Sequence, residues 1–108
     1  MSELIIKTLT IGENASKAYS IIFDGITTVS NPSVTVYKNE SSDVTSTVMP
    51  SDSHTVSGNV LTMKPLVPTG MGGQTLTADI IVTADGNTEE RFIRWYVAKQ
   101  ESGKVRRK

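Results

Sequence analysis

Residues 88–97 read Thr-Glu-Glu-Arg-Phe-Ile-Arg-Trp-Tyr-Val, and they place aromatic side chains on both faces of one expected strand. Successive side chains of a β-strand point to opposite faces. We expect three of them to face a core: Ile93, Trp95 and Val97. The other face then carries Phe92, Arg94 and Tyr96, where a lone domain normally shows polar residues. A one-residue bulge would instead turn Phe92 inward and leave Trp95 at the rim. We favour the first arrangement, which makes this face a candidate docking surface.

The rest of the chain consists of short alternating segments separated by turn residues. Val, Ile, Thr and Ser are abundant and no segment keeps a helical period, which favours strands. The expected strands cover residues 3–11, 18–23, 33–37, 43–49, 54–56, 60–63 and 75–84. Ser57-Gly58-Asn59 suits a tight hairpin, and the loop at residues 65–73, rich in Pro and Gly, suits a crossover between sheets. The sequence therefore predicts an all-β antiparallel sandwich of seven to eight strands.

Length, charge and composition limit the number of domains and the classes of protein to which the chain can belong. The 108 residues fit one domain, which we place at residues 1–98, followed by a basic tail at residues 99–108. The formal net charge is zero, so the overall field does not steer the chain onto nucleic acid. No cysteine is present, and no run approaches the roughly 18 apolar residues of a membrane helix. We expect a protein that is made and first kept soluble in the cytoplasm.

No group of residues predicts catalysis. His54 is the only histidine, and we expect it exposed at a strand edge, so a catalytic triad or a multi-histidine metal site has no basis. Loop carboxylates could offer oxygen ligands to calcium, but they are scattered, and turn formation explains them without a metal. These carboxylates are Asp24, Asp43, Asp52 and Asp85. We expect a protein that is not an enzyme and that has no cofactor.

Residues 17–98 resemble immunoglobulin-like or fibronectin-type-III-like domains. The resemblance rests on a strand ending near Tyr37, the hairpin into Val60-Leu61-Thr62-Met63, the Pro65-Leu66 step, the glycine-rich loop and residues 74–82. The inter-sheet cysteine pair of antibody domains is absent, and Leu76 stands where such domains commonly carry the corner tyrosine. What remains is the looser sandwich class found in bacterial surface proteins and tailed-phage virions.

Two short segments look most like small virion proteins of tailed phages and prophages: Val36-Tyr37-Lys38-Asn39 and Asp43-Val44-Thr45-Ser46. This resemblance implies a structural role without chemistry, such as a capsid decoration or cement protein or a small tail-associated module. It also implies localisation in the virion after assembly in the host cytoplasm, with the major capsid protein or another virion protein as partner. The alternative is a carbohydrate- or surface-binding accessory module of a tail or cell-surface protein.

Three regions are candidates for partner binding, and we expect a homo-oligomer. In a sandwich the last two strands share a sheet with the third, so Tyr37 and Ile81 join Phe92, Arg94 and Tyr96 on one surface. The first strand is too apolar for a free edge, so Leu4 and Ile6 would pair with a neighbouring subunit. The tail could bind an acidic protein surface or phosphates through Lys104, Arg106, Arg107 and Lys108. No aromatic residue is interleaved with these charges, so nucleic acid is not favoured.

Overall fold

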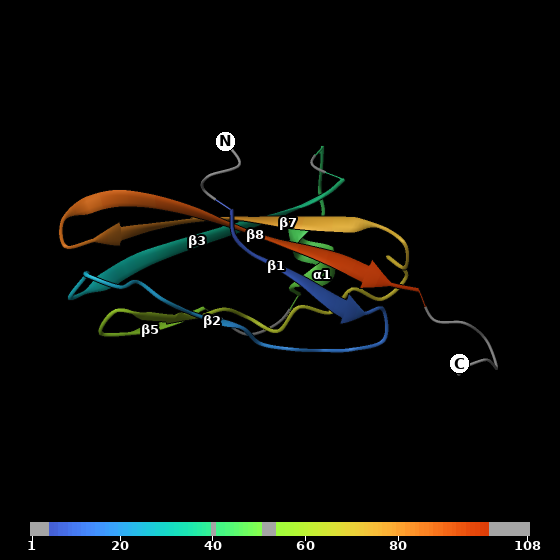
Figure 1. Ribbon diagram of the computed structural model, residues 1–108, viewed down its shortest axis with the longest axis horizontal. Coiled ribbons are helices and arrows are strands. Elements are labelled where there is room, and N and C mark those ends of the chain that lie inside the picture. Colours follow the sequence, from blue (N-terminus) through green and yellow to red (C-terminus); the bar gives the residue numbers. More distant parts are fainter. Residues whose placement is uncertain (1–4, 40, 51–53, 100–108) are drawn as a thin grey trace.

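The computed structural model describes residues 5–39, 41–50 and 54–99, with only the backbone described for residues 5 and 6. Two β-sheets form two layers, with β3, β7 and β8 in the upper layer of Figure 1 and β2 and β5 in the lower. The larger sheet has the order β1 (Ile5–Gly12), β8 (Asn87–Ala98), β7 (Thr75–Ala84), β3 (Val29–Lys38) and β4 (Ser42–Asp43). The smaller has the order β2 (Ser20–Ile22), β6 (Val60–Thr62) and β5 (Thr55–Ser57). The all-β prediction is therefore confirmed.

One strand pairing departs from the antiparallel prediction. β1 runs parallel to β8, from Ile5 beside Phe92 to Gly12 beside Ala98, with a register shift between Ile5 and Lys7. The other pairings between strands are antiparallel. Parallel neighbours need a long connection, and here the whole intervening chain supplies it. Alternation within residues 3–11 could not reveal this direction, because a side-chain pattern is the same for either orientation.

The expected strand at residues 43–49 is wrong. After the two residues of β4, the chain forms the short helix α1 (Thr45–Val48). The carboxylate of Asp43 accepts hydrogen bonds from the Thr45 backbone N–H (3.0 Å) and hydroxyl (2.7 Å), which turns the chain at the start of the helix. The helix and the residue after it bury Val48 and Met49 in the core, and α1 packs against β3.

The core lies between the two layers, and β8 contributes to it as expected. Ile93, Trp95 and Val97 are 4%, 0% and 0% exposed. Trp95 packs against Tyr19, with ring centroids 5.3 Å apart and planes tilted by 56°. The β7–β8 pairing runs without a register shift, so the alternative of a bulge that exposes Trp95 is excluded.

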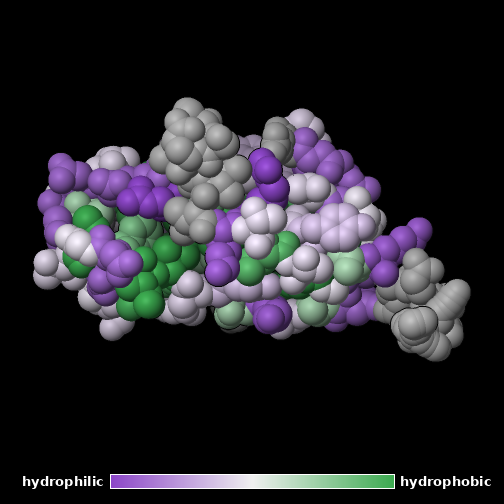
Figure 2. All heavy atoms as spheres, viewed as in Figure 1, coloured by the Kyte–Doolittle hydropathy of each residue, from purple (hydrophilic) through white to green (hydrophobic). Residues whose placement is uncertain are grey.

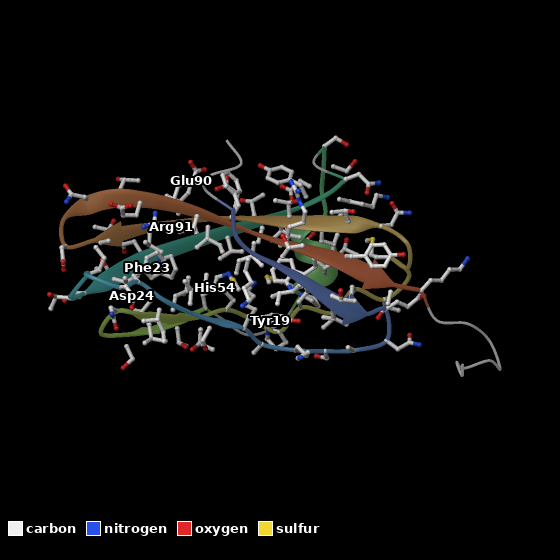
Figure 3. All side chains as sticks on the ribbon, viewed as in Figure 1. Tyr19, Phe23, Asp24, His54, Glu90 and Arg91 are labelled. Atoms are coloured by element: carbon white, nitrogen blue, oxygen red, sulfur yellow. The ribbon has the colours of Figure 1, made fainter. Side chains whose placement is uncertain are left out.

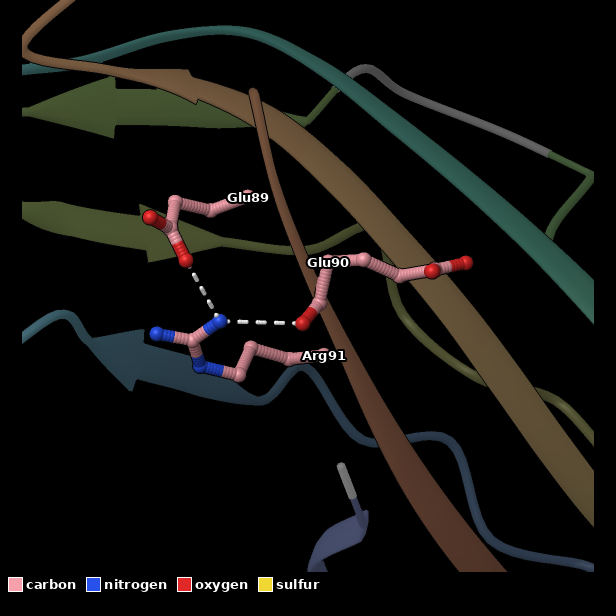
Figure 4. A network of polar contacts seen from close by, with 3 residues as sticks. All are labelled: Glu89, Glu90 and Arg91. Atoms are coloured by element: carbon pink, nitrogen blue, oxygen red, sulfur yellow. Dashed lines mark hydrogen bonds and ion pairs between the residues drawn. The ribbon is translucent and has the colours of Figure 1, made fainter. Parts of the chain in front are cut away.

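The N-terminal part of β8 lies at an open edge of the sandwich. The pairing with β1 begins at Phe92, so Asn87–Arg91 have no strand on that side within the described residues. Here the guanidinium of Arg91 lies 5.7 Å above the Phe23 ring and forms an ion pair with Glu89 at 2.9 Å (Figure 4). Figure 2 shows apolar residues gathered at this end, where Figure 3 labels Phe23. A side chain rather than a strand therefore covers this part of the core.

Candidate protein-binding face

The outer face of the five-stranded sheet brings the predicted aromatic residues together. Across β3, β7 and β8, Tyr37 lies beside Thr77 and Thr77 beside Arg94, while Asp79 lies between Thr35 and Phe92. Their neighbours in sequence point into the core, so these side chains point away from it. We define the outer face by these residues and those in line with them: Thr35, Tyr37, Thr77, Asp79, Ile81, Glu90, Phe92, Arg94 and Tyr96.

Exposure varies across the outer face. Tyr96 is 49% exposed and Ile81 37%, so both present apolar area to solvent. Three outer-face side chains are half-buried rather than fully exposed: Tyr37, Phe92 and Arg94. We expected more exposure for side chains that point away from the core. Thr77 is only 8% exposed. The outer face is therefore a packed surface of aromatic, aliphatic and hydroxyl side chains.

Two carboxyl groups lie within this surface, and the sequence analysis did not identify them. Asp79 on β7 and Glu90 on β8 are diagonal neighbours across the two strands, because Asp79 pairs with Phe92 and Ile81 with Glu90. Burial, a hydrogen bond with Glu90 and repulsion by the Glu90 charge raise the pKa of Asp79 to about 6. Only the strand register brings these residues together, so no local motif could have indicated the pair.

Polar atoms of the outer face also lack partners. Thr77 Oγ1 and Asp79 Oδ1 are buried and form no hydrogen bond within the described structure. A buried polar atom without a partner costs about 1–3 kcal/mol. A bound molecule with matching donors would offset part of that cost.

Two of the four carboxylates considered for calcium, Asp43 and Asp85, form hydrogen bonds within turns. Asp43 bonds Thr45, as described above, and Asp85 accepts hydrogen bonds from the backbone N–H groups of Thr27 and Thr28, each at 2.9 Å. Asp52 lies outside the described residues. Over the described ranges, no group of three or more His, Cys, Asp or Glu side chains is placed to hold a metal ion.

His54 differs from its expected position. It is half-buried rather than exposed, and its Nδ1 accepts a hydrogen bond from the Lys64 backbone N–H at 3.1 Å. Burial, followed by the nearby Lys64 charge, lowers the pKa of His54. Its ring therefore has a structural role between the start of β5 and the end of β6.

The other predicted binding residues are only partly described. Leu4 lies outside the described residues, and of Ile6 only the backbone is described, within β1. β1 itself pairs with β8 of the same chain at the end of the sheet. The tail residues Lys104, Arg106, Arg107 and Lys108 lie outside the described residues. Among the predicted binding residues, the structure therefore describes the side chains of the outer face only.

Comparison with known proteins adds no identification. No family model matches the chain, and no curated protein matches its sequence. In the described ranges, no helix combines the length and the apolar composition needed to cross a membrane.

Proposed function

We propose that this chain is a non-enzymatic sandwich of the immunoglobulin-like class that works by binding proteins through its outer face. The strand order supports the class. In immunoglobulin variable-type domains, the third strand shares a sheet with the last two and is followed by an added strand on the same sheet. The order β8-β7-β3-β4, opposite β2-β6-β5, has this arrangement.

The composition of the outer face is the observation that carries the proposal. Aromatic residues and Arg are enriched in interface cores, because they bury a large area and Arg can stack on rings. Here Phe92, Tyr96 and Arg94 alternate with the core residues of one strand, and Tyr37 and Ile81 lie on the same surface. A single strand thus builds both the core and the docking surface.

The biological role we propose is that of a capsid decoration or cement protein of a tailed phage. Support comes from the sequence resemblance to small virion proteins and from a surface suited to protein contacts. The partners would be further copies of the chain and the major capsid protein, met in the host cytoplasm and retained in the virion. A chain without cysteine can assemble there without oxidation.

A carbohydrate-binding module is the alternative function. A sugar site is expected to be concave and to contain an aromatic platform. The recess beside α1 is lined by Asp43, Thr45, Ser46, Met49, Pro50 and Lys64, with no aromatic residue among them. The aromatic residues lie instead on a sheet face, which favours a protein partner.

The test compares two double variants with the wild-type chain. Phe92→Ala with Tyr96→Ala removes aromatic area from the outer face, whereas Ile22→Ala with Val56→Ala removes exposed apolar area from the smaller sheet. Light scattering after size exclusion, over a concentration series, gives the molar mass. We expect an oligomer for the wild type and the control, and a folded monomer for the face variant.

Two results would contradict the proposal. An unchanged oligomer in the face variant would remove the outer face from self-assembly. A strictly monomeric wild type would show that copies of the chain do not use this face with one another. Circular dichroism of each variant separates loss of assembly from loss of folding.

A further inference from the structure

The backbone groups of β8 face its two sides alternately, and two residues direct theirs to the open edge. Val97 bonds residues 73 and 74, immediately before β7, through its C=O at 2.8 Å and its N–H at 3.0 Å. Thr88 and Glu90 lie an odd number of positions before Val97, and β8 pairs with β7 without a register shift. Because backbone groups alternate between the two sides of a strand, the N–H and C=O groups of Thr88 and Glu90 face away from β7.

The side chain of Arg91 occupies one of these edge groups. Its Nη1 donates hydrogen bonds to the Glu90 backbone carbonyl and to Glu89 Oε1, each at 2.9 Å (Figure 4). The same guanidinium lies over the ring of Phe23, 5.7 Å from its centroid. A strand that paired with this edge would need the Glu90 carbonyl as an acceptor, so it would have to displace Arg91. Charged side chains at a sheet edge are one way in which proteins prevent unwanted pairing.

The open edge matches the same edge of a second copy. Within the described residues, it is bounded by the hairpin turn before Asn87 and by the start of β1 beside Phe92. In an antiparallel pairing centred on Glu89, Thr88 lies opposite Glu90 of the second copy, so the N–H and C=O groups that face the edge satisfy one another. A longer strand from another protein would meet β1 at one end. The occupant that fits this edge is therefore a second copy of the chain.

We propose that Arg91 holds the open edge of β8 closed against pairing with a second copy of this chain. The guanidinium does so by occupying the Glu90 carbonyl and by covering the Phe23 ring. Pairing at the edge breaks this hydrogen bond once in each copy. The inference goes beyond the proposed function, because it concerns the backbone of the edge and not the side chains of the outer face. With the edge closed, the outer face remains available for contacts between copies.

Disulfide cross-linking tests this edge specifically, because the chain has no cysteine. Glu89→Cys places one thiol at the centre of the edge. In the antiparallel pairing, the two copies of position 89 form a pair that is not hydrogen-bonded, with Cα atoms about 4.5 Å apart, which suits a disulfide. The experiment compares Glu89→Cys with Glu89→Cys/Arg91→Thr under the same mild oxidation and follows the covalent dimer by mass spectrometry. We expect the dimer to form at least about tenfold faster without Arg91, because a hydrogen bond from a charged donor is worth about that factor or more.

Two further variants serve as controls. Thr47→Cys/Arg91→Thr has its thiol at an exposed position of α1, away from the opened edge, and should cross-link slowly. Glu89→Cys/Arg91→Met keeps an apolar side chain over Phe23 but cannot donate to the Glu90 carbonyl, so it should cross-link as fast as the threonine variant and replaces it if that variant folds poorly by circular dichroism.

The result that would overturn the inference is an equal rate of cross-linking with and without Arg91. Cross-linking that is as fast from position 47 as from position 89 would also overturn it, because the contact would then not be at the edge. Both results would leave the outer face untouched as a docking surface, since its test depends on other residues and on the molar mass of the unlinked chain.

Discussion

Adjacent residues on β8 allow a direct test of which face is core. Trp95 is fully buried, whereas Tyr96 is 49% exposed, so the two substitutions Trp95→Ala and Tyr96→Ala remove aromatic rings of opposite environment from one strand. We expect Trp95→Ala to lower the free energy of unfolding by about 3–5 kcal/mol. We expect Tyr96→Ala to lower it by less than about 1 kcal/mol, because its ring is half in water.

The larger value is consistent with the local packing. A buried Trp removes roughly 200 Å² from water, which at about 25 cal/mol per Å² gives about 5 kcal/mol for the whole residue. Loss of the tilted contact with Tyr19 adds about 0.5–1.5 kcal/mol. Trp95 Nε1 is buried without a hydrogen-bond acceptor in the described structure, which destabilises the wild type. Trp95→Ala removes this unpaired group, so the net loss of stability is smaller than the burial of the ring alone would give.

Urea unfolding followed by circular dichroism measures both variants at low protein concentration. Tryptophan fluorescence cannot serve for Trp95→Ala, because this is the only tryptophan of the chain. For a domain of this size, 3–5 kcal/mol corresponds to a fall in Tm of roughly 12–40 °C. Equal destabilisation by the two substitutions, or a larger effect of Tyr96→Ala, would refute the assignment of the faces.

Three further predictions concern parts of the fold away from Trp95. Gly72→Ala should lower the free energy of unfolding by about 1–3 kcal/mol, because a Cβ there would lie 2.9 Å from Lys99 Cα. Gly12→Ala is the control, because a Cβ there meets open space, and it should change the free energy of unfolding by no more than about 0.5 kcal/mol in the same urea assay. Arg91→Ala should lower the free energy of unfolding by about 1 kcal/mol and expose Phe23, which binding of a hydrophobic dye would detect. Arg91→Met should lower it by less, because an apolar side chain still covers the ring. An equal loss in both variants would assign the effect to the charge of Arg91 alone. Hydrogen bonds from Thr27 and Thr28 lower the pKa of Asp85, so their contribution is present above about pH 4 and is lost as the pH falls below that value. Thermal unfolding between about pH 3 and about pH 5 should therefore show a smaller acid loss for Asp85→Asn than for the wild type.

Alternation in the sequence was sufficient to predict β7 and β8, whereas β3 begins at Val29, four residues before its expected start, because a register shift between Ser30 and Ser33 lets the strand continue through Asn31-Pro32. In β7 and β8, the apolar residues recur at every second position, and the structure buries them on one side. The hairpin at Ser57-Gly58-Asn59 and the crossover between β6 and β7 are also as expected. Period and turn residues are local properties, so they can be identified without a partner strand.

The segment at residues 43–49 shows where the same approach fails. Its Ser and Thr residues favour strands, but Val44, Val48 and Met49 recur at a helical spacing, and the latter two are fully buried. A hydrogen bond from the Val36 backbone N–H to Thr45 Oγ1, 2.8 Å long, fixes this turn against β3. That contact spans two elements, so the propensity of the segment alone could not reveal it.

In the candidate site too, some features follow from the sequence of a single strand and others depend on how the strands pair. The sides on which Phe92, Arg94 and Tyr96 lie follow from alternation within one strand. Their grouping with Tyr37 and Ile81 required a topology, which the sandwich class supplied. The Asp79–Glu90 pair required the register of β7 on β8 as well, and a slip of one residue would send one of the two carboxyl groups to the core side.

The carboxyl pair also makes the stability of the fold depend on pH. A carboxyl group whose pKa is raised by folding destabilises the native state as the pH rises from the unfolded value, 3.8, through about 6. At neutral pH the monomer therefore bears a cost that a neutral residue at position 79 would remove, with Thr35 and Thr77 already showing that hydroxyl side chains fit this surface. Asp79→Asn removes this titrating group and keeps a side chain of similar shape. We therefore expect Asp79→Asn to be more stable than the wild type in urea unfolding at about pH 7 and to lose this advantage by about pH 4, because Asp79 is protonated in both the folded and the unfolded chain below its unfolded pKa. Equal stability of the two chains at both pH values would contradict the raised pKa of Asp79.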